Sequence, residues 1–209
     1  MQGLVESIAT RSNLPRPAVH NAWKPVAEAI IEALSNDLEV NLLGLAHMRV
    51  VLRPERTFTH PLTQQEMVMP AERLVIVTPA PALFCAANPS WTPQDAAQAI
   101  TDALPEEWED REILDATPLL YAHAHAQGLA AETVEDAALD CVVDAIIHAS
   151  KDERENVLVL DGIGHFRFAY REGYIGVHPD TLKPLLHRRQ AQLRLDPGLT
   201  LRAELALPG

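Results

Sequence analysis

The sequence contains little cysteine, no long apolar run and no excess of positive charge. Cys85 and Cys141 are the only cysteines among 209 residues. Both have apolar neighbours, so we expect buried free thiols rather than a disulfide scaffold. No run of about 18 apolar residues occurs, which argues against a membrane-spanning helix. Residues 1–6 carry no basic or long apolar segment, so we expect no secretory signal and a cytoplasmic protein.

Motifs typical of enzymes are also absent from the sequence. It contains no Gly-rich phosphate loop, no Cys-x-x-Cys pair and no nucleophile elbow. His123 and His125 are two residues apart, and this spacing on a helix directs the two side chains to different faces instead of one metal ion. We therefore expect no enzymatic activity, no cofactor and no metal.

Charge is abundant but unevenly distributed. The chain has 17 Lys and Arg against 29 Asp and Glu, a net charge of -12. This balance excludes a uniformly basic nucleic-acid coat, because a phosphate-binding surface needs cations. Residues 96–155 carry a net charge of -12, whereas residues 1–95 carry -2 and residues 156–209 carry +2. Residues 165–194 contain six basic and two acidic side chains, so this segment is locally cationic.

The acidic excess falls in two places. We interpret residues 106–110 as a solvated linker. The second place is one face of an expected helix, which either is solvated or docks a basic protein partner. The acidic residues of this face are Glu132, Glu135, Asp136, Asp140 and Asp144.

Three blocks of the sequence recur in the same order. The helical pattern around Val26 recurs around Val142, 116 residues later, and residues 60–63 recur as 178–181 at an offset of 118. We interpret three ordered matches as a tandem duplication. The block between them also shifts by 118 residues: it holds Gly44, His47 and Arg49 in the first copy, and Gly162, His165 and Arg167 in the second.

Each half predicts the same order of elements. A short helix precedes a longer amphipathic helix, in which apolar residues recur at steps of three and four. Two strands hinged at a glycine follow, then an excursion with a proline, a third strand and a closing helix. In the first half the expected elements are residues 4–12, a helix containing Val26, and residues 39–43, 47–52, 73–77 and 80–87. In the second half they are about 119–126, a helix containing Val142, and residues 156–160, 165–170, 190–195 and 197–205. Residues 94–104 form an expected linker helix.

This arrangement resembles the HU and integration-host-factor family of DNA-bending proteins. The Gly-Phe-Gly-Ser/Thr-Phe turn of the family is matched by residues 162–166 and less closely by residues 44–48. Its arm-tip motif Asn-Pro-x-Thr is matched by residues 60–63 and 178–181, and its closing region is echoed by residues 195–202. The order and the duplication of these motifs carry the resemblance.

The resemblance implies an α+β fold built from two tandem HU/IHF-like units. Residues 1–88 form unit 1, residues 89–111 an acidic linker with a short helix, and residues 112–209 unit 2. Each unit has a helical hairpin, a three-stranded sheet with an extended β-arm, and a short C-terminal helix. We expect the helices to form a base below two three-stranded sheets. The units pair either within one chain, as a pseudo-dimer, or between two chains, as a homodimer.

The resemblance also implies a DNA-binding, nucleoid-associated protein that bends duplex DNA through its minor groove. A proline at each arm tip acts as the apolar wedge, and arginines on the arms and sheets meet phosphates. We expect salt-sensitive binding of weak to moderate affinity. The candidate DNA-binding residues are Arg49, Arg53, Arg56, His60, Pro61, Arg73, Arg167, Arg171, His178, Pro179, Lys183, Arg188, Arg189 and Arg194.

Both arm tips depart from the family pattern and lose a cation and turn-forming residues. The substituted positions are Thr59, His60 and Gln64 in the first tip, and Val177, His178 and Leu182 in the second. Phosphate contacts supply most non-specific affinity. The alternative function is therefore a diverged HU-like module for protein–protein interaction or assembly, with DNA binding reduced or lost. Arg188 and Arg189 are either a solvated strand edge or phosphate contacts.

Overall fold

The computed structural model describes residues 3–60, 62–88, 90–102, 112–149, 157–171, 173–177, 184–187 and 190–207. The first half contains α1 (Leu4–Arg11), α2 (Arg16–Ser35), β1 (Glu39–Leu42), β2 (Ala46–Arg53), β3 (Arg56–Thr59), β4 (Glu66–Met69), β5 (Glu72–Pro79) and α3 (Pro81–Ala87). Then come α4 (Pro93–Asp102) and β6 (Ile113–Asp115). The second half contains α5 (Ala116–Ala126), α6 (Ala131–Ala149), β7 (Val157–Leu160), β8 (Gly164–Arg171), β9 (Tyr174–Val177), β10 (Pro184–His187), β11 (Gln190–Pro197) and α7 (Leu199–Leu205).

The strand ladders of the two halves have the same register. In the first half β1 pairs antiparallel with β2, and β2 with β5. In the second half β7 pairs with β8, and β8 with β11, in the same way. The fold therefore repeats at the spacing at which the sequence repeats. Cα partners that differ by 118 residues are Val40–Met48 and Ala46–Pro79 in the first half, and Leu158–Phe166 and Gly164–Pro197 in the second.

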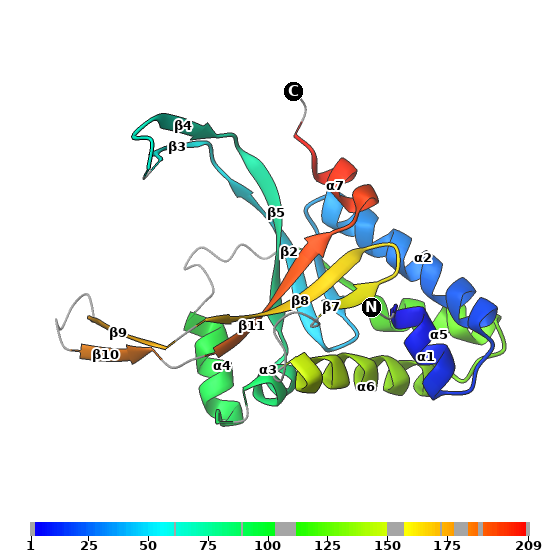
Figure 1. Ribbon diagram of the computed structural model, residues 1–209. Helices are drawn as coiled ribbons and strands as arrows, with labels where there is room; N and C mark the ends of the chain where they lie inside the picture. The colour runs from blue at the N-terminus through cyan, green and yellow to red at the C-terminus, as the bar shows by residue number, and fades with distance from the viewer. Residues whose placement is uncertain are drawn as a thin grey trace.

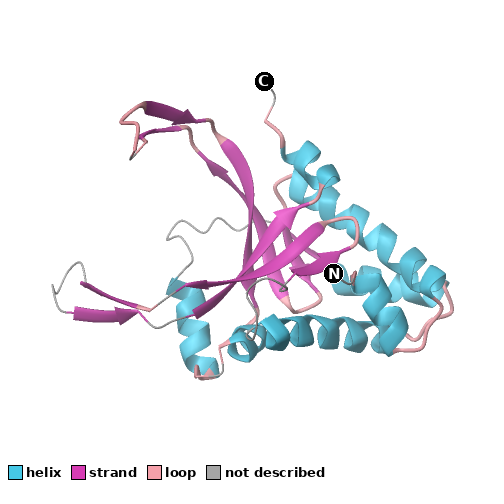
Figure 2. Ribbon diagram, viewed as in Figure 1, coloured by secondary structure: helices cyan, strands magenta, loops and turns pink. Residues whose placement is uncertain are grey.

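The helices of the two halves interleave into one base (Figures 1 and 2). Helix α2 packs against α5 and α7, and α6 packs against α1 and α3. On α2, the fully buried Trp23 and Ile30 belong to the same hydrophobic core as Leu120 of α5 and Val142 of α6. Burying one large apolar side chain contributes about 1.5–3 kcal/mol. The two halves therefore share one hydrophobic core, and its burial stabilises their contact.

Each half also adds backbone to the sheet of the other half. Strand β6 pairs in parallel with β1, which gives a four-stranded sheet in the order β5-β2-β1-β6. The prediction of two three-stranded sheets is therefore wrong for the first sheet. The second sheet has three strands, β11-β8-β7, and an isolated parallel bridge joins Gly3 to Val159. In both cases the segment just before the first helix of one half lies along the first strand of the other half.

Two arms extend from the sheets on the side away from the helical base (Figure 1). The first arm consists of β3 and β4, and the second arm of β9 and β10. Pro61, in the tip of the first arm, and residues 178–183, between β9 and β10, lie outside the described residues, as do residues 103–111 between α4 and β6.

The two cysteines are free thiols in different environments. Cys141 is buried, as expected, whereas Cys85 is only half-buried. Burial raises the pKa of the Cys141 thiol. Within the described ranges, no helix is both long and apolar enough to cross a membrane.

Candidate nucleic-acid interface

The sheet of the second half presents arginines on the face opposite the core. Phe166 of β8 and Leu195 of β11 are buried in the core, so alternate residues of these strands point to the other face. We call the faces of both sheets opposite the core the saddle face. Arg167 and Arg194 lie directly opposite each other on it.

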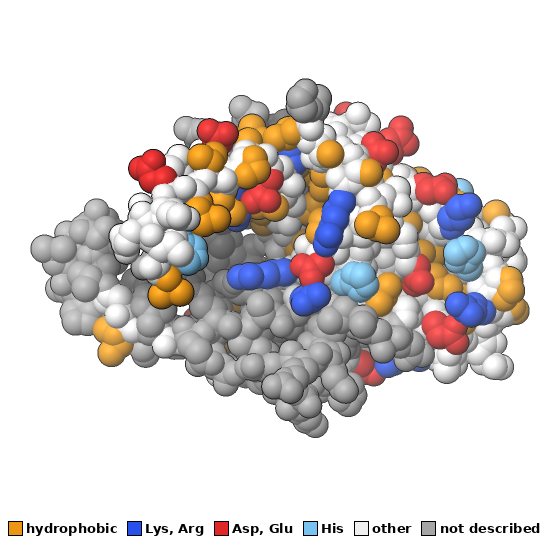
Figure 3. Space-filling model, turned by 45° about the horizontal axis from the view of Figure 1, so that its top comes forward, with side chains coloured by type: hydrophobic (Ala, Val, Ile, Leu, Met, Phe, Trp, Pro, Cys, Tyr) orange, Lys and Arg blue, Asp and Glu red, His pale blue; other side chains and the backbone are white. Residues whose placement is uncertain are grey.

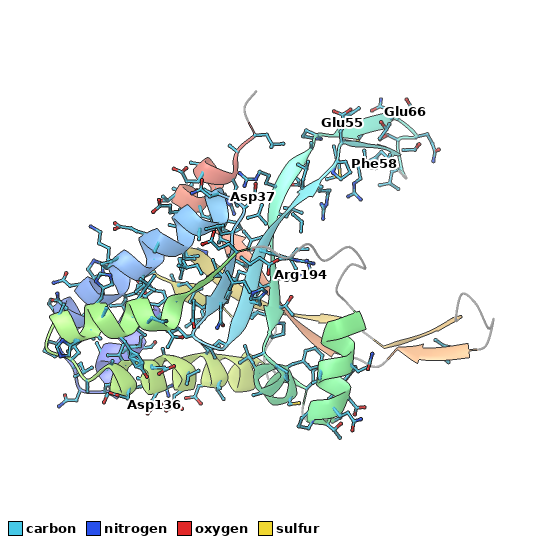
Figure 4. All side chains as sticks on the ribbon, turned by 180° about the vertical axis from the view of Figure 1, so that it is seen from behind. Asp37, Glu55, Phe58, Glu66, Asp136 and Arg194 are labelled. Atoms are coloured by element: carbon cyan, nitrogen blue, oxygen red, sulfur yellow. The ribbon has the colours of Figure 1, made fainter. Side chains whose placement is uncertain are left out.

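Asp196 partly neutralises this pair of cations. The Nε atom of Arg167 forms an ion pair with the Asp196 carboxylate, and the Arg167 side chain keeps 59% of its surface exposed. Arg194 is exposed, and Figure 4 shows it beside the strands at the base of the arms. In Figure 3, Lys or Arg side chains gather near the centre of the molecule at the edge of a hollow. This part of the saddle face can therefore hold an anionic ligand.

The corresponding part of the first half is less cationic. Arg49, the counterpart of Arg167, is buried and lies opposite Ile76, which takes the place of Arg194. Further along the strand, Nη1 of Arg53 binds Oε1 of Glu72 at 2.8 Å. Among the described residues, the saddle face is therefore electrostatically asymmetric, because Arg49 is buried and Ile76 stands where the second half has the exposed Arg194.

Arg73 is bound to the end of a helix. Its Nη2 atom donates to the carbonyl of Ser35, the last residue of α2, at 3.0 Å and to Oδ1 of Asp37 at 2.6 Å. Its side chain is 15% exposed. Arg73 lies on the same side of β5 as Val75 and Val77, because every second side chain of a strand points to the same face. The burial of Val77 identifies this side as the core side.

The first arm carries apolar and acidic side chains along with one exposed arginine. Arg56 lies opposite Met69, with Nη2 at 3.3 Å from Sδ, and Phe58 lies opposite Met67 on the same face of the arm. Phe58 is 38% exposed and Met67 45%. Figure 4 labels Glu55 and Glu66 along this arm with Phe58. Its surface therefore offers less positive charge than the saddle face of the second half.

His60 organises the tip of the first arm. Its Nδ1 atom accepts the backbone N–H groups of Leu62 at 3.3 Å and of Thr63 at 3.2 Å. An asparagine before a proline makes the same kind of turn through its side-chain oxygen, so His60 retains turn-forming chemistry that the sequence predicts as lost. Because Nδ1 accepts, the neutral ring carries its proton on Nε2 and can donate outward. Gln64 adopts a φ of +55° at the position where the family has glycine.

The remaining candidates are only partly placed. Arg171 lies opposite Gln190 at the outer end of the β8–β11 ladder. The other six candidates fall outside the described residues: Pro61, His178, Pro179, Lys183, Arg188 and Arg189.

Sequence reasoning missed the role of Asp161. It predicts a turn residue there, and the structure shows Asp161 in the β7–β8 turn, where its Oδ2 atom accepts the backbone N–H of Val5 at 3.0 Å. Its carbonyl accepts from Nε1 of Trp23 at 2.8 Å. The signal available in the sequence is the difference between the repeats, because Leu43 occupies the equivalent turn position.

The comparisons with known proteins agree with the resemblance for the first half of the chain. Residues 1–88 match the family model described as Bacterial DNA-binding protein. Among solved structures, the chain is similar to an HU protein of Anabaena in a cocrystal with DNA. The identity is 27% over 35% of this chain and 80% of that chain, with a TM-score of 0.30. None of the curated proteins compared with this chain matches it. Residues 1–88 are therefore similar to the family of bacterial DNA-binding proteins, and this similarity covers less than half of the chain.

Proposed function

We propose that this chain is a non-enzymatic, HU-like architectural protein that binds and bends duplex DNA as a single-chain pseudo-dimer. Residues 1–88 act as one subunit, residues 112–209 as the other, and residues 89–111 link them. The observation that carries the proposal is the family match of the first half together with the repetition of its strand registers in the second half.

The interleaved helices support pairing within one chain. Arg11 of α1 forms an ion pair with Asp144 of α6, and Trp23 of α2 donates to the β7–β8 turn. Strands β5 and β11 also contact each other, which joins the two sheets. Both halves therefore contribute to one saddle face, and one arm extends from each sheet (Figure 2).

The cations of the second half are the proposed phosphate contacts. Arg167 and Arg194 occupy the saddle face, and Arg171 lies at the outer end of the same ladder. Lys183, Arg188 and Arg189 are further proposed phosphate contacts, because they flank β10 in the sequence. Arg49, Arg53 and Arg56 make a weaker contribution from the first half, because the first is buried and the second is paired with Glu72. The affinity of this site depends steeply on salt.

The arm tips are the proposed contacts to the minor groove. Pro61 and Pro179 provide rigid apolar wedges that part a base step. His60 donates from Nε2 to a groove acceptor, because its Nδ1 atom is used by the turn. His178 takes the corresponding place in the second tip.

A gel-shift titration at several salt concentrations tests the proposal. Replacing both Arg167 and Arg194 by alanine should weaken binding and reduce the slope of log affinity against log salt by about 1.8, since each phosphate contact contributes about 0.9. Lys24→Ala is the matched control, because Lys24 is exposed on α2 in the helical base and pairs only loosely, at 3.8 Å, with Glu28. No retardation of DNA even at low salt would contradict the proposal.

The first arm favours a second candidate function, which is protein–protein interaction or assembly with reduced DNA binding. Phe58, Met67 and Val68 are exposed on its two strands, and Glu55 and Glu66 are acidic. Reversing the charge of Arg188 and Arg189 separates the two functions. The double variant should lose DNA binding if the chain binds DNA, and should capture a protein partner unchanged if it serves assembly.

A further inference from the structure

The N-terminus of α1 is capped by the other half of the chain. Gly3, the N-cap residue of α1, has no side chain to accept the first free N–H groups of the helix. Asp161 supplies the acceptor from the β7–β8 turn, with Oδ2 at 3.0 Å from the Val5 nitrogen. A Cβ atom at Gly3 would lie 2.9 Å from both carboxylate oxygens of Asp161. A larger residue at position 3 would therefore displace the Asp161 carboxylate from its place beside the Val5 N–H.

The equivalent contact on the other side of the molecule has different residues. Gly3 bridges Val159 in parallel, and Asp115 pairs in parallel with Asn41, which lies 118 residues before Val159. Asp115 is thus the counterpart of Gly3, and Leu43 is the counterpart of Asp161. Helix α5 is capped by its own Asp115, whose Oδ1 atom accepts the Thr117 N–H at 3.0 Å. The Leu43 side chain is buried and apolar.

We propose that two sites, the one where Asp161 meets Gly3 and the equivalent one that carries Leu43 and Asp115, select the pairing of unlike halves and exclude the pairing of like halves. The partner that each half fits is the other half of this sequence, and not the same half of a second copy. This inference rests on the tandem-unit arrangement of the proposed function and adds the residues that determine partner choice.

Each like pair would replace both of these sites with a less favourable combination. If two second halves paired, Asp161 would meet Asp115, which is the counterpart of Gly3. A Cβ atom at Gly3 would already lie 2.9 Å from the Asp161 oxygens, so the Asp115 carboxylate would be brought close to the Asp161 carboxylate, and like charges at short distance repel. If two first halves paired, Leu43 would face Gly3, and the Val5 N–H would have no side-chain acceptor from either residue. The loss of a helix cap alone corresponds to about a ten-fold change in an equilibrium constant.

Exchange between the halves tests the proposal and requires no DNA. A protease recognition sequence is introduced within residues 103–111 of the full chain. The folded protein is cleaved there, and the two halves are then unfolded together in denaturant and allowed to refold. Native mass spectrometry should then find unlike pairs in an excess of at least about ten-fold over like pairs. Like pairs in statistical amounts, or halves that stay apart, would overturn the proposal, whereas a failure to bind DNA would leave this result unchanged.

A double-mutant cycle in the uncleaved chain tests the contact itself. Gly3→Asp should lower the melting temperature in the wild-type background, because its side chain meets the Asp161 carboxylate. In the Asp161→Ala background the same substitution should lower it much less, since the carboxylate has been removed. Equal losses in both backgrounds would show that the two residues do not select each other.

Discussion

Arg73 shows how an arginine on a predicted DNA-binding strand can stabilise the fold. It shares the core side of β5 with Val75 and Val77 and binds the carbonyl end of α2. Alternation along the strand is sufficient to indicate this orientation, because Val77 has to face the core. Arg167 and Arg194 are instead the immediate sequence neighbours of the buried Phe166 and Leu195. They therefore point to the opposite face of the sheet, which is the saddle face.

Arg73→Ala should therefore reduce stability more than DNA binding. We expect the free energy of unfolding to fall by about 1.5–3 kcal/mol, the range for a hydrogen bond to a charged group, because Asp37 and the end of α2 lose their partner. Chemical denaturation measures this loss, and a gel shift measures affinity. Arg194→Ala is the comparison and should show the reverse, with little change in stability and weaker DNA binding. A large affinity loss in Arg73→Ala at unchanged stability would contradict the assignment.

Tyr121 links α5 to α6 through a hydrogen bond whose contribution to stability depends on pH. Its hydroxyl donates to Oε2 of Glu135, and this hydrogen bond raises the pKa of Tyr121 to about 12. Because the folded pKa exceeds the usual value near 10, the hydrogen bond stabilises the fold fully below about pH 10. This contribution is lost as the pH rises through about 12.

Glu135→Gln should lower the pKa of Tyr121 toward 10, because it removes the carboxylate that accepts the hydrogen bond from the Tyr121 hydroxyl. The ultraviolet absorbance of tyrosinate measures the titration, with Tyr170 and Tyr174 replaced by phenylalanine so that Tyr121 is the remaining tyrosine. Asp136→Asn removes a nearby charge that contributes less to the shift, and it should leave most of the shift in place. An unchanged pKa in Glu135→Gln would rule out the hydrogen bond as its main cause.

At the scale of elements, periodicity and the repeat predict most of the fold. The two expected closing helices overlap α3 and α7, and the expected linker helix overlaps α4. All six expected strands overlap strands of the two ladders. Strand β6 was not predictable, because three residues are too few to establish an alternating pattern and its partner β1 is distant in sequence. Residues 106–110 lie outside the described residues, so the solvated linker expected there stays a prediction.

The first arm tip depends on His60 as a hydrogen-bond acceptor. His60→Ala should speed hydrogen exchange of the Leu62 and Thr63 amides, which lose their acceptor. His60→Asn should restore slow exchange, because its side-chain oxygen accepts in the same turn. Exchange measured by NMR distinguishes these amides from those of β5, where neither variant should have an effect. Equal exchange in the alanine and asparagine variants would contradict this role.

At the scale of the whole molecule, the negative net charge does not describe the proposed DNA-binding surface. The acidic excess of residues 96–155 includes exposed side chains of α6 in the helical base, among them Asp136 (Figure 4). Arg167 and Arg194, in contrast, lie on the opposite side of the sheets. The chain is thus polarised, and we infer that the acidic base directs DNA toward the saddle face.

The pairing of the halves could not be decided from sequence. A linker of this length is compatible with pairing within one chain or between two chains. The contacts between the halves, such as Asp161 with Val5 and β6 with β1, join residues far apart in sequence and carry no local signal. The predicted duplication rests on motifs that recur at offsets of 116 and 118 residues. In our proposal, partner choice depends instead on positions such as 3, 43, 115 and 161, at which the two halves carry different residues.

In the proposed arrangement one chain supplies both subunits of a DNA-bending protein, and a titration of doubly labelled duplex DNA is the decisive experiment. Energy transfer between fluorophores at the duplex ends measures bending, and native mass spectrometry of the same samples measures stoichiometry. We expect transfer to rise as the protein is added at low salt, with a complex of one 23.0 kDa chain per duplex. Unchanged transfer with no complex, or a bent duplex that always carries two chains, would contradict the arrangement.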